Sequence, residues 1–225
     1  MFAALARAFA DLSAPPMRRV VGLGLGLTVA SFILLWLAVA LALDRLVRFA
    51  WQPLDWAVQL LGAAGVLVVS WLLFPAVATL IMGLFLDRIA AAVEALDYPA
   101  LAPPRRRPAS EGLAVTLRMM GLSIALNLLA LPVYLLAPGA NFFVFLSLNG
   151  YLFGREYFEV VALRRLDRQA VAAVRRRFGG RVFLGGVVIA GLFLLPLVNL
   201  LAPAIATAFM VHVFVRLPEP RAVAP

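Results

Sequence analysis

The stretch VVGLGLGLTVASFILLWLAVALAL, residues 20–43, contains no charged side chain, whereas Arg18 and Arg19 precede it and Asp44 and Arg45 follow it. At a helical rise of about 1.5 Å per residue, a run of this length matches the hydrocarbon layer of a bilayer, which is about 30 Å thick. Residues 20–43 are therefore predicted to form a transmembrane helix.

The composition of the whole chain agrees with this prediction. Of the 225 residues, 64% are hydrophobic and 14% are charged, and the mean hydropathy is +1.01. An average soluble domain is about half apolar and about one quarter charged. These values exclude a water-soluble fold. The sequence predicts an all-helical (all-α) integral membrane protein, with residues 1–225 forming a single membrane domain.

The chain is strongly basic, with a formal net charge of +9 and a pI near 11.4. Its arginines lie between the apolar runs, where the positive-inside rule places basic residues on the cytoplasmic side of the membrane. There they would meet the anionic headgroups of membrane lipids. We therefore expect membrane lipids as partners, cytoplasmic N- and C-termini, and no nucleic-acid partner.

The residues that usually carry enzyme or metal chemistry are scarce. The chain has no cysteine, and His212 is its single histidine. One imidazole without a cysteine or a second histidine does not make a zinc site, so no metal or other cofactor is predicted, and His212 is expected at the membrane interface. No phosphate loop, activated nucleophile or catalytic carboxylate pair occurs at a recognisable spacing, which argues against an enzyme.

A second apolar run, residues 56–86, lies between Asp55 and Asp87. It is predicted to be a second long transmembrane helix, and because it is longer than one crossing requires, it should be tilted or kinked near Pro75. Residues 87–118 contain an amphipathic piece and then the run APPRRRPAS, whose prolines and arginines do not suit a buried helix. This segment is predicted to be a cytoplasmic connector.

Two further apolar regions, 119–153 and 182–215, are interrupted by prolines and are predicted to be broken helical hairpins. The segment LPVYLLAPGA at 131–140 and the segment LPLVNLLAPAI at 195–205 share the order Leu-Pro, then Leu-Leu-Ala-Pro, which is a weak internal repeat. Paired interrupted segments of this kind are a sequence indication of a transport pathway.

Residues 154–178, between the two hairpins, are predicted to form an arginine-rich amphipathic helix at the membrane surface, and residues 216–225 form a C-terminal tail. The lengths of the hairpin arms leave open whether the hairpins cross the bilayer fully or enter it in part. Polar hairpin tips inside a bilayer must be covered by protein or water, so a homo-oligomer is predicted.

The first candidate site lies at the start of the first membrane helix. Arg18 and Arg19 precede the closely spaced Gly22, Gly24 and Gly26. Two guanidinium groups, free backbone N–H groups and the positive end of a helix dipole together suit an oxyanion, so Arg18, Arg19 and Gly22 are the predicted substrate-binding residues. Two alternatives remain: the arginines set the topology, and Gly22 and Gly26 form a helix-packing face.

The second candidate group lies near and within the interrupted segments. Arg155 and Glu159 in GREYFE have the spacing of a helical ion pair, and Glu156 lies between them. A carboxylate near the membrane is costly unless paired, so this group is either a structural pair or a coupling or gating element. Asn199 either lines a hydrated path or bonds between helices. Arg155, Glu156, Glu159 and Asn199 are the coupling or gating candidates.

Three segments carry a resemblance to a known family. They are LFPAVATLIMGLFLDRIAAAVEALDYP at 73–99, NGYLFGREYFEVVALRR at 149–165 and LLPLVNLLAPAIATAFMVHVF at 194–214. Together, and in this order, they resemble the family that joins the CysZ-type sulfate permeases to the etoposide-induced 2.4 domain proteins. The resemblance extends over nearly the whole chain.

The resemblance implies a bacterial inner-membrane protein with partly inserted hairpins that takes up sulfate for cysteine biosynthesis. It also implies an anion site at a Gly-hydrophobic-Arg stretch that starts the first membrane helix. The matching stretch here is 15–19, which keeps Arg18 and Arg19 but has Pro16 where the glycine is expected. Proline provides no backbone N–H for the anion.

Two hypotheses follow. The first is an inner-membrane anion permease, with sulfate as the leading substrate, that supplies sulfur assimilation without an ATPase of its own. The second is a membrane scaffold or regulatory subunit that binds lipid or a partner through the arginine-rich amphipathic helix. Sulfate dependence that survives substitution of Arg18 and Arg19 would favour the scaffold.

Overall fold

The computed structural model describes residues 1–46, 52–105 and 109–218, and within these ranges the chain contains helices and turns but no strand. Parts of the predicted connector (residues 106–108) and of the predicted tail (219–225) lie outside the described residues. The chain divides into two compact units. We call Met1–Arg18 together with the chain from Leu86 onward the bundle, and Arg19–Phe85 the long hairpin.

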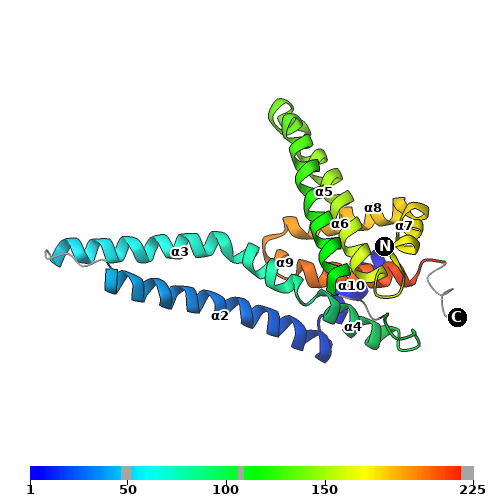
Figure 1. The fold of residues 1–225 in the computed structure, drawn as a ribbon, viewed down its shortest axis with the longest axis horizontal. Helices are drawn as coiled ribbons and strands as arrows, with labels where there is room; N and C mark the ends of the chain where they lie inside the picture. Colours follow the sequence, from blue (N-terminus) through cyan, green and yellow to red (C-terminus); the bar gives the residue numbers. More distant parts are fainter. Residues whose placement is uncertain (47–51, 106–108, 219–225) are drawn as a thin grey trace. The chain divides into compact units, whose positions relative to one another are not determined.

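The long hairpin consists of helices α2 (Pro15–Leu46, whose first turn belongs to the bundle) and α3 (Gln52–Gly83), which run antiparallel (Figure 1). The indole Nε1 of Trp36 donates a hydrogen bond of 2.8 Å to the hydroxyl of Ser70, and a Cβ on Gly24 would lie 3.1 Å from the Cε of Met82. Gly24, rather than the predicted Gly22 and Gly26, is therefore the glycine at the α2–α3 contact.

Large apolar side chains cover the outside of the long hairpin. Leu34 is 66% exposed and Trp71 is 79% exposed. A soluble protein rarely leaves so many large apolar groups uncovered, whereas lipid tails cover them at no cost. These exposures agree with the predicted membrane-embedded helices.

Among the described residues, two helices are long and apolar enough to cross a membrane, Pro15–Ala42 and Leu117–Leu136. The first corresponds to the predicted helix 20–43. The predicted second helix, 56–86, corresponds to α3, in which Val58–Phe74 and Val77–Gly83 meet at 42°, at the position where a kink was predicted. If each bent pair is counted as one span, the described residues contain up to four candidate spans.

The core of the bundle is α10 (Ala202–Val215), every residue of which is buried. A helix that is apolar on all faces is stable only when other elements surround it. Apart from α9, which precedes it in the chain, four described helices pack against α10: α1 (Phe2–Asp11), α4 (Leu86–Asp97), α6 (Asn141–Ala162) and α8 (Gly179–Leu194). Figure 1 shows α10 next to α4 and α6.

Both predicted hairpins are present in the bundle. In the first, α5 (Ala109–Leu136) leads through the short 3-10 turn η1 (Pro138–Ala140) into α6 and packs against it. In the second, α8 is followed by the single turn α9 (Pro196–Asn199) and then by α10.

The predicted amphipathic helix 154–178 is corrected by the structure. Helix α6 continues through Arg155 to Ala162, and a separate helix, α7 (Arg168–Arg177), follows after a turn. The break occurs because the Asp167 carboxylate accepts a hydrogen bond of 2.7 Å from the backbone N–H of Ala170, which starts a new helix at that point.

The hairpins are joined where α6 crosses α8 at three glycines. A Cβ on Gly186 would collide with the backbone of Gly150 and Gly154, and a Cβ on Gly154 would collide with the carbonyl of Val182. Only glycine allows two helix backbones to approach this closely. The crossing therefore depends on the absence of side chains at these positions.

Replacing Gly186 with alanine should destabilise the bundle by about 3 kcal/mol, because the new methyl group meets backbone atoms that cannot rotate away. Gly191 is the matched control on the same helix, because an added Cβ there meets nothing within 4 Å. Gly191→Ala should be neutral or stabilising by up to about 1 kcal/mol. Thermal unfolding of both variants in detergent measures the difference, and equal melting temperatures would contradict the assignment.

Candidate functional site

The predicted oxyanion residues lie at the start of α2. Arg18 and Arg19 are exposed, and the backbone N–H of Arg18 already donates to the carbonyl of Ala14 at 2.9 Å. Gly22 lies beyond the first turn of α2, where backbone amides are used by the helix itself. The backbone N–H groups of Arg18 and Gly22 are therefore not free for an anion, and the donors that these residues and Arg19 offer are the two guanidinium groups.

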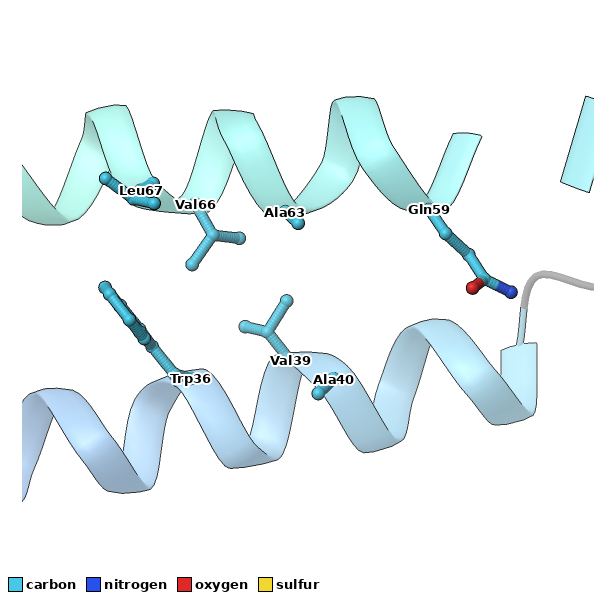
Figure 2. Close-up of a pocket in the computed structure, with 7 residues that line it drawn as sticks. All are labelled: Trp36, Val39, Ala40, Gln59, Ala63, Val66 and Leu67. Carbon is cyan, nitrogen blue, oxygen red and sulfur yellow. The ribbon is translucent and has the colours of Figure 1, made fainter. Parts of the chain in front are cut away.

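A cavity of about 370 Å³ lies within the long hairpin, between α2 and α3 (Figure 2). Its walls are aliphatic and aromatic apart from Gln59, and the indole N–H of Trp36 is already bonded to Ser70. A doubly charged oxyanion needs several donors or cations to replace its hydration. This cavity suits an apolar group rather than sulfate.

The predicted pair of Arg155 and Glu159 is present and buried. The Nε of Arg155 donates to the Glu159 carboxylate at 3.0 Å, and these residues are 8% and 9% exposed. The Nη1 of Arg175 on α7 donates to the same carboxylate oxygen at 2.9 Å, which the sequence analysis did not foresee. We call Arg155, Glu159 and Arg175 the α6–α7 cluster.

The α6–α7 cluster has an excess of positive charge. One carboxylate faces two guanidinium groups, and Arg118 adds a further repulsion on Arg175. Burial, followed by repulsion from Arg155, lowers the pKa of Arg175 below its usual value. An anion that entered this cluster would relieve the imbalance.

The other predicted gating residues lie apart from these ion pairs. Glu156 is exposed, although it is adjacent to Arg155 in α6. Asn199 ends α9, and among the described residues its buried Oδ1 has no hydrogen-bond partner. A buried, unsatisfied amide oxygen is costly unless water or a ligand bonds to it, so Asn199 remains a candidate for a hydrated path.

A second buried cluster joins α4 to the turn that follows α6. Arg164 donates to both carboxylate oxygens of Glu94, at 3.3 and 3.1 Å, and Arg165 donates to one of them at 2.9 Å. The carbonyl of Arg164 accepts from the N–H of Arg105, and Arg165 also donates to the carbonyl of Ala102. These bonds hold the start of the proline-rich connector against the bundle.

A third cluster surrounds His212, which the sequence analysis expected at an interface and which is instead 0% exposed. Its Nε2 lies 2.8 Å from a carboxylate oxygen of Asp11 and 3.7 Å from one of Asp97, and its Nδ1 lies 2.8 Å from the hydroxyl of Tyr98. Burial raises the pKa of Asp11, against the lowering effect of His212.

The sequence contains one signal that could have indicated the His212 cluster. His212 lies in a helix whose other residues are almost all apolar, and a buried imidazole requires a hydrogen-bonding partner. The identity of that partner could not be read from the sequence, because Asp11 is 201 positions away. Glu94 and Arg164 were missed for the same reason, with 70 positions between them.

These features define a class of protein: a helical membrane protein with broken hairpins and buried arginine–carboxylate pairs. The sequence matches the family described as Sulfate transporter CysZ/Etoposide-induced protein 2.4 over residues 4–203. Because the match covers most of the chain, the protein belongs to this family, whose description includes a sulfate transporter. A search of curated proteins found no match.

Replacing Glu159 with glutamine should destabilise the bundle by about 3 kcal/mol, because Arg155 and Arg175 would keep their charges without a counter-charge. Glu156→Gln is the matched control, since it makes the same chemical change at an exposed neighbouring position. Thermal unfolding should show a lower midpoint for Glu159→Gln alone. If both variants unfold at the same temperature, the ion pairs contribute no stability.

Proposed function

We propose that this protein is an anion permease of the bacterial inner membrane, with sulfate as its leading substrate. The observation that carries the proposal is membership of the sulfate transporter family over residues 4–203. Uptake would supply sulfur assimilation and cysteine biosynthesis. No nucleotide-binding motif occurs in the sequence, so movement would be passive or coupled to an ion gradient.

The arginines support an anion as the substrate. A guanidinium group presents several N–H donors in one plane and binds an oxyanion through two of them, so Arg18 and Arg19 could receive sulfate at the protein surface. Gly22 would contribute by leaving open space, because nothing lies within 4 Å of an added Cβ there. Pro16 would limit binding to side-chain donors.

The remaining candidates would act after this first contact. In the α6–α7 cluster, an incoming anion could compete with Glu159 for Arg155 and Arg175, which would make the carboxylate a gate. Glu156 and Asn199 would contribute to coupling or to a hydrated path. Cytoplasmic termini and a homo-oligomer that covers the exposed apolar helices complete the proposal.

The double substitution Arg18→Gln and Arg19→Gln should abolish sulfate uptake above the background of empty liposomes. The physical reason is that glutamine removes both charges while it keeps the side chains polar and long. The measurement is uptake of radiolabelled sulfate into proteoliposomes that contain the purified protein, with and without a proton gradient.

The control is the double variant Arg176→Gln and Arg216→Gln. It loses the same two positive charges at exposed positions elsewhere on the bundle. This variant should transport sulfate at the rate of the unmodified protein. If the Arg18 and Arg19 variant still takes up sulfate, these two residues are not part of the substrate-binding site. If the folded, reconstituted protein transports no sulfate either with or without a proton gradient, the proposal of a sulfate permease is wrong.

A membrane scaffold is the second candidate function, and α7 is the observation that favours it. Arg168, Arg176 and Arg177 are exposed on this short helix, whereas Val171 is buried against the bundle. Exposed arginines on an amphipathic helix attract anionic headgroups, at about 1 kcal/mol for each residue near the surface.

If α7 binds lipid, replacing Arg168 and Arg176 with glutamine should reduce the number of anionic lipids that remain bound to the detergent-purified protein. Native mass spectrometry would count these lipids. The Arg18 and Arg19 variant serves as the comparison with equal net charge. Equal retention by the two variants would mean that α7 has no special affinity for anionic lipid.

A further inference from the structure

We propose that Asp11, Asp97 and His212 form a binding site for one divalent transition-metal ion in the bundle. The three residues come from the end of α1, the end of α4 and the last turn of α10. Their ligand atoms all lie within 4.8 Å of one another. The proposal revises the expectation that no metal is bound, because the fold brings two carboxylates to the single histidine. The site is separate from the arginines of the proposed transport function and does not depend on that function.

The distances are close to those that a metal requires. Four ligands placed tetrahedrally at about 2.0 to 2.1 Å from a zinc ion lie about 3.3 Å from one another. The Nε2 of His212 lies 2.8 Å from Asp11 and 3.7 Å from Asp97, on either side of that spacing. The carboxylates would move toward this spacing to accommodate the ion.

The imidazole ring is held in the orientation that a ligand needs. The hydroxyl of Tyr98 lies 2.8 Å from Nδ1, so Nε2 is the nitrogen that faces both carboxylates. Metal-binding histidines generally donate their other ring N–H to an oxygen, which fixes the tautomer, and with a metal at Nε2 the Nδ1–H of His212 would donate to the Tyr98 hydroxyl. Tyr98 would then be a positioning residue for His212.

The charges also match a divalent cation. Two carboxylates and a neutral imidazole carry two negative charges, which one divalent ion cancels in a place where His212 is 0% and Asp11 is 5% exposed. A protonated imidazole would cancel only one of them. Arg7 is an electrostatic neighbour of Asp11, but Arg7 is exposed and its charge is screened by solvent.

Binding would replace a proton with the ion. The Nε2 lone pair would form the bond to the metal, and the proton shared with Asp11 would leave to solvent. Asp97, whose side chain is 25% exposed, provides the access route. The occupied site would tie α1 to α4 and α10, and therefore stabilise the packing of the N-terminal helix on the core.

The test uses the full chain in detergent, without a histidine tag, after removal of metals with a chelator. Equilibrium dialysis against Zn²⁺ followed by elemental analysis should find roughly one bound ion per chain, and Zn²⁺ should raise the melting temperature. Asp97→Asn should weaken the affinity more than tenfold, and Tyr98→Phe, which keeps all three ligands, should weaken it about tenfold.

Asp167→Asn is the matched control, because it removes a carboxylate at the start of α7 and asparagine caps a helix equally well. This variant should bind Zn²⁺ as the unmodified protein does. Two outcomes would overturn the proposal: no Zn²⁺ bound by the folded protein, or equal binding by the unmodified protein and Asp97→Asn. In either case the cluster holds only a proton, as a hydrogen-bonded contact between α1, α4 and α10.

Discussion

The complete burial of α10 is the constraint on which the rest of the bundle depends. No residue of Ala202–Val215 is left for solvent, so α1, α4, α6 and α8 must surround it. For α6 and α8 to do this while they contact each other, their backbones must approach closely, which requires Gly150, Gly154 and Gly186. The absence of side chains at the α6–α8 crossing thus allows these helices to pack together and still surround α10 with apolar residues.

Polar groups inside such a bundle must find partners, and each cluster joins elements that are distant in sequence. Glu159 binds arginines from α6 and α7, and Glu94 binds the arginines that follow α6. His212 joins α10 to the ends of α1 and α4. A buried ion pair contributes little net stability over apolar packing, but an unpaired member is strongly unfavourable, so these pairs specify which helices meet.

Local patterns were sufficient for much of the architecture. The uncharged run at 20–43, the proline-interrupted regions and the Arg155–Glu159 spacing each depend on neighbouring residues, and the structure contains the corresponding helix, hairpins and ion pair. The break at Asp167 was missed because amphipathic periodicity continues across it and the cap competes with that periodicity. The sequence did not show that Gly24, rather than Gly22, lies at the α2–α3 contact. Both glycines belong to one repeated pattern, and the position of Met82 decides which of them meets α3.

By itself the sequence determined the class: a helical membrane protein whose arginines lie between apolar runs and whose segments resemble the sulfate transporter family. Hydropathy and composition are sums over residues, so no three-dimensional information is needed for them. Only the tertiary structure decided which charged residues meet, that Arg175 joins Glu159 and that Asp11 reaches His212. The reason is that a buried polar side chain requires some partner, and the path of the chain through space selects which one.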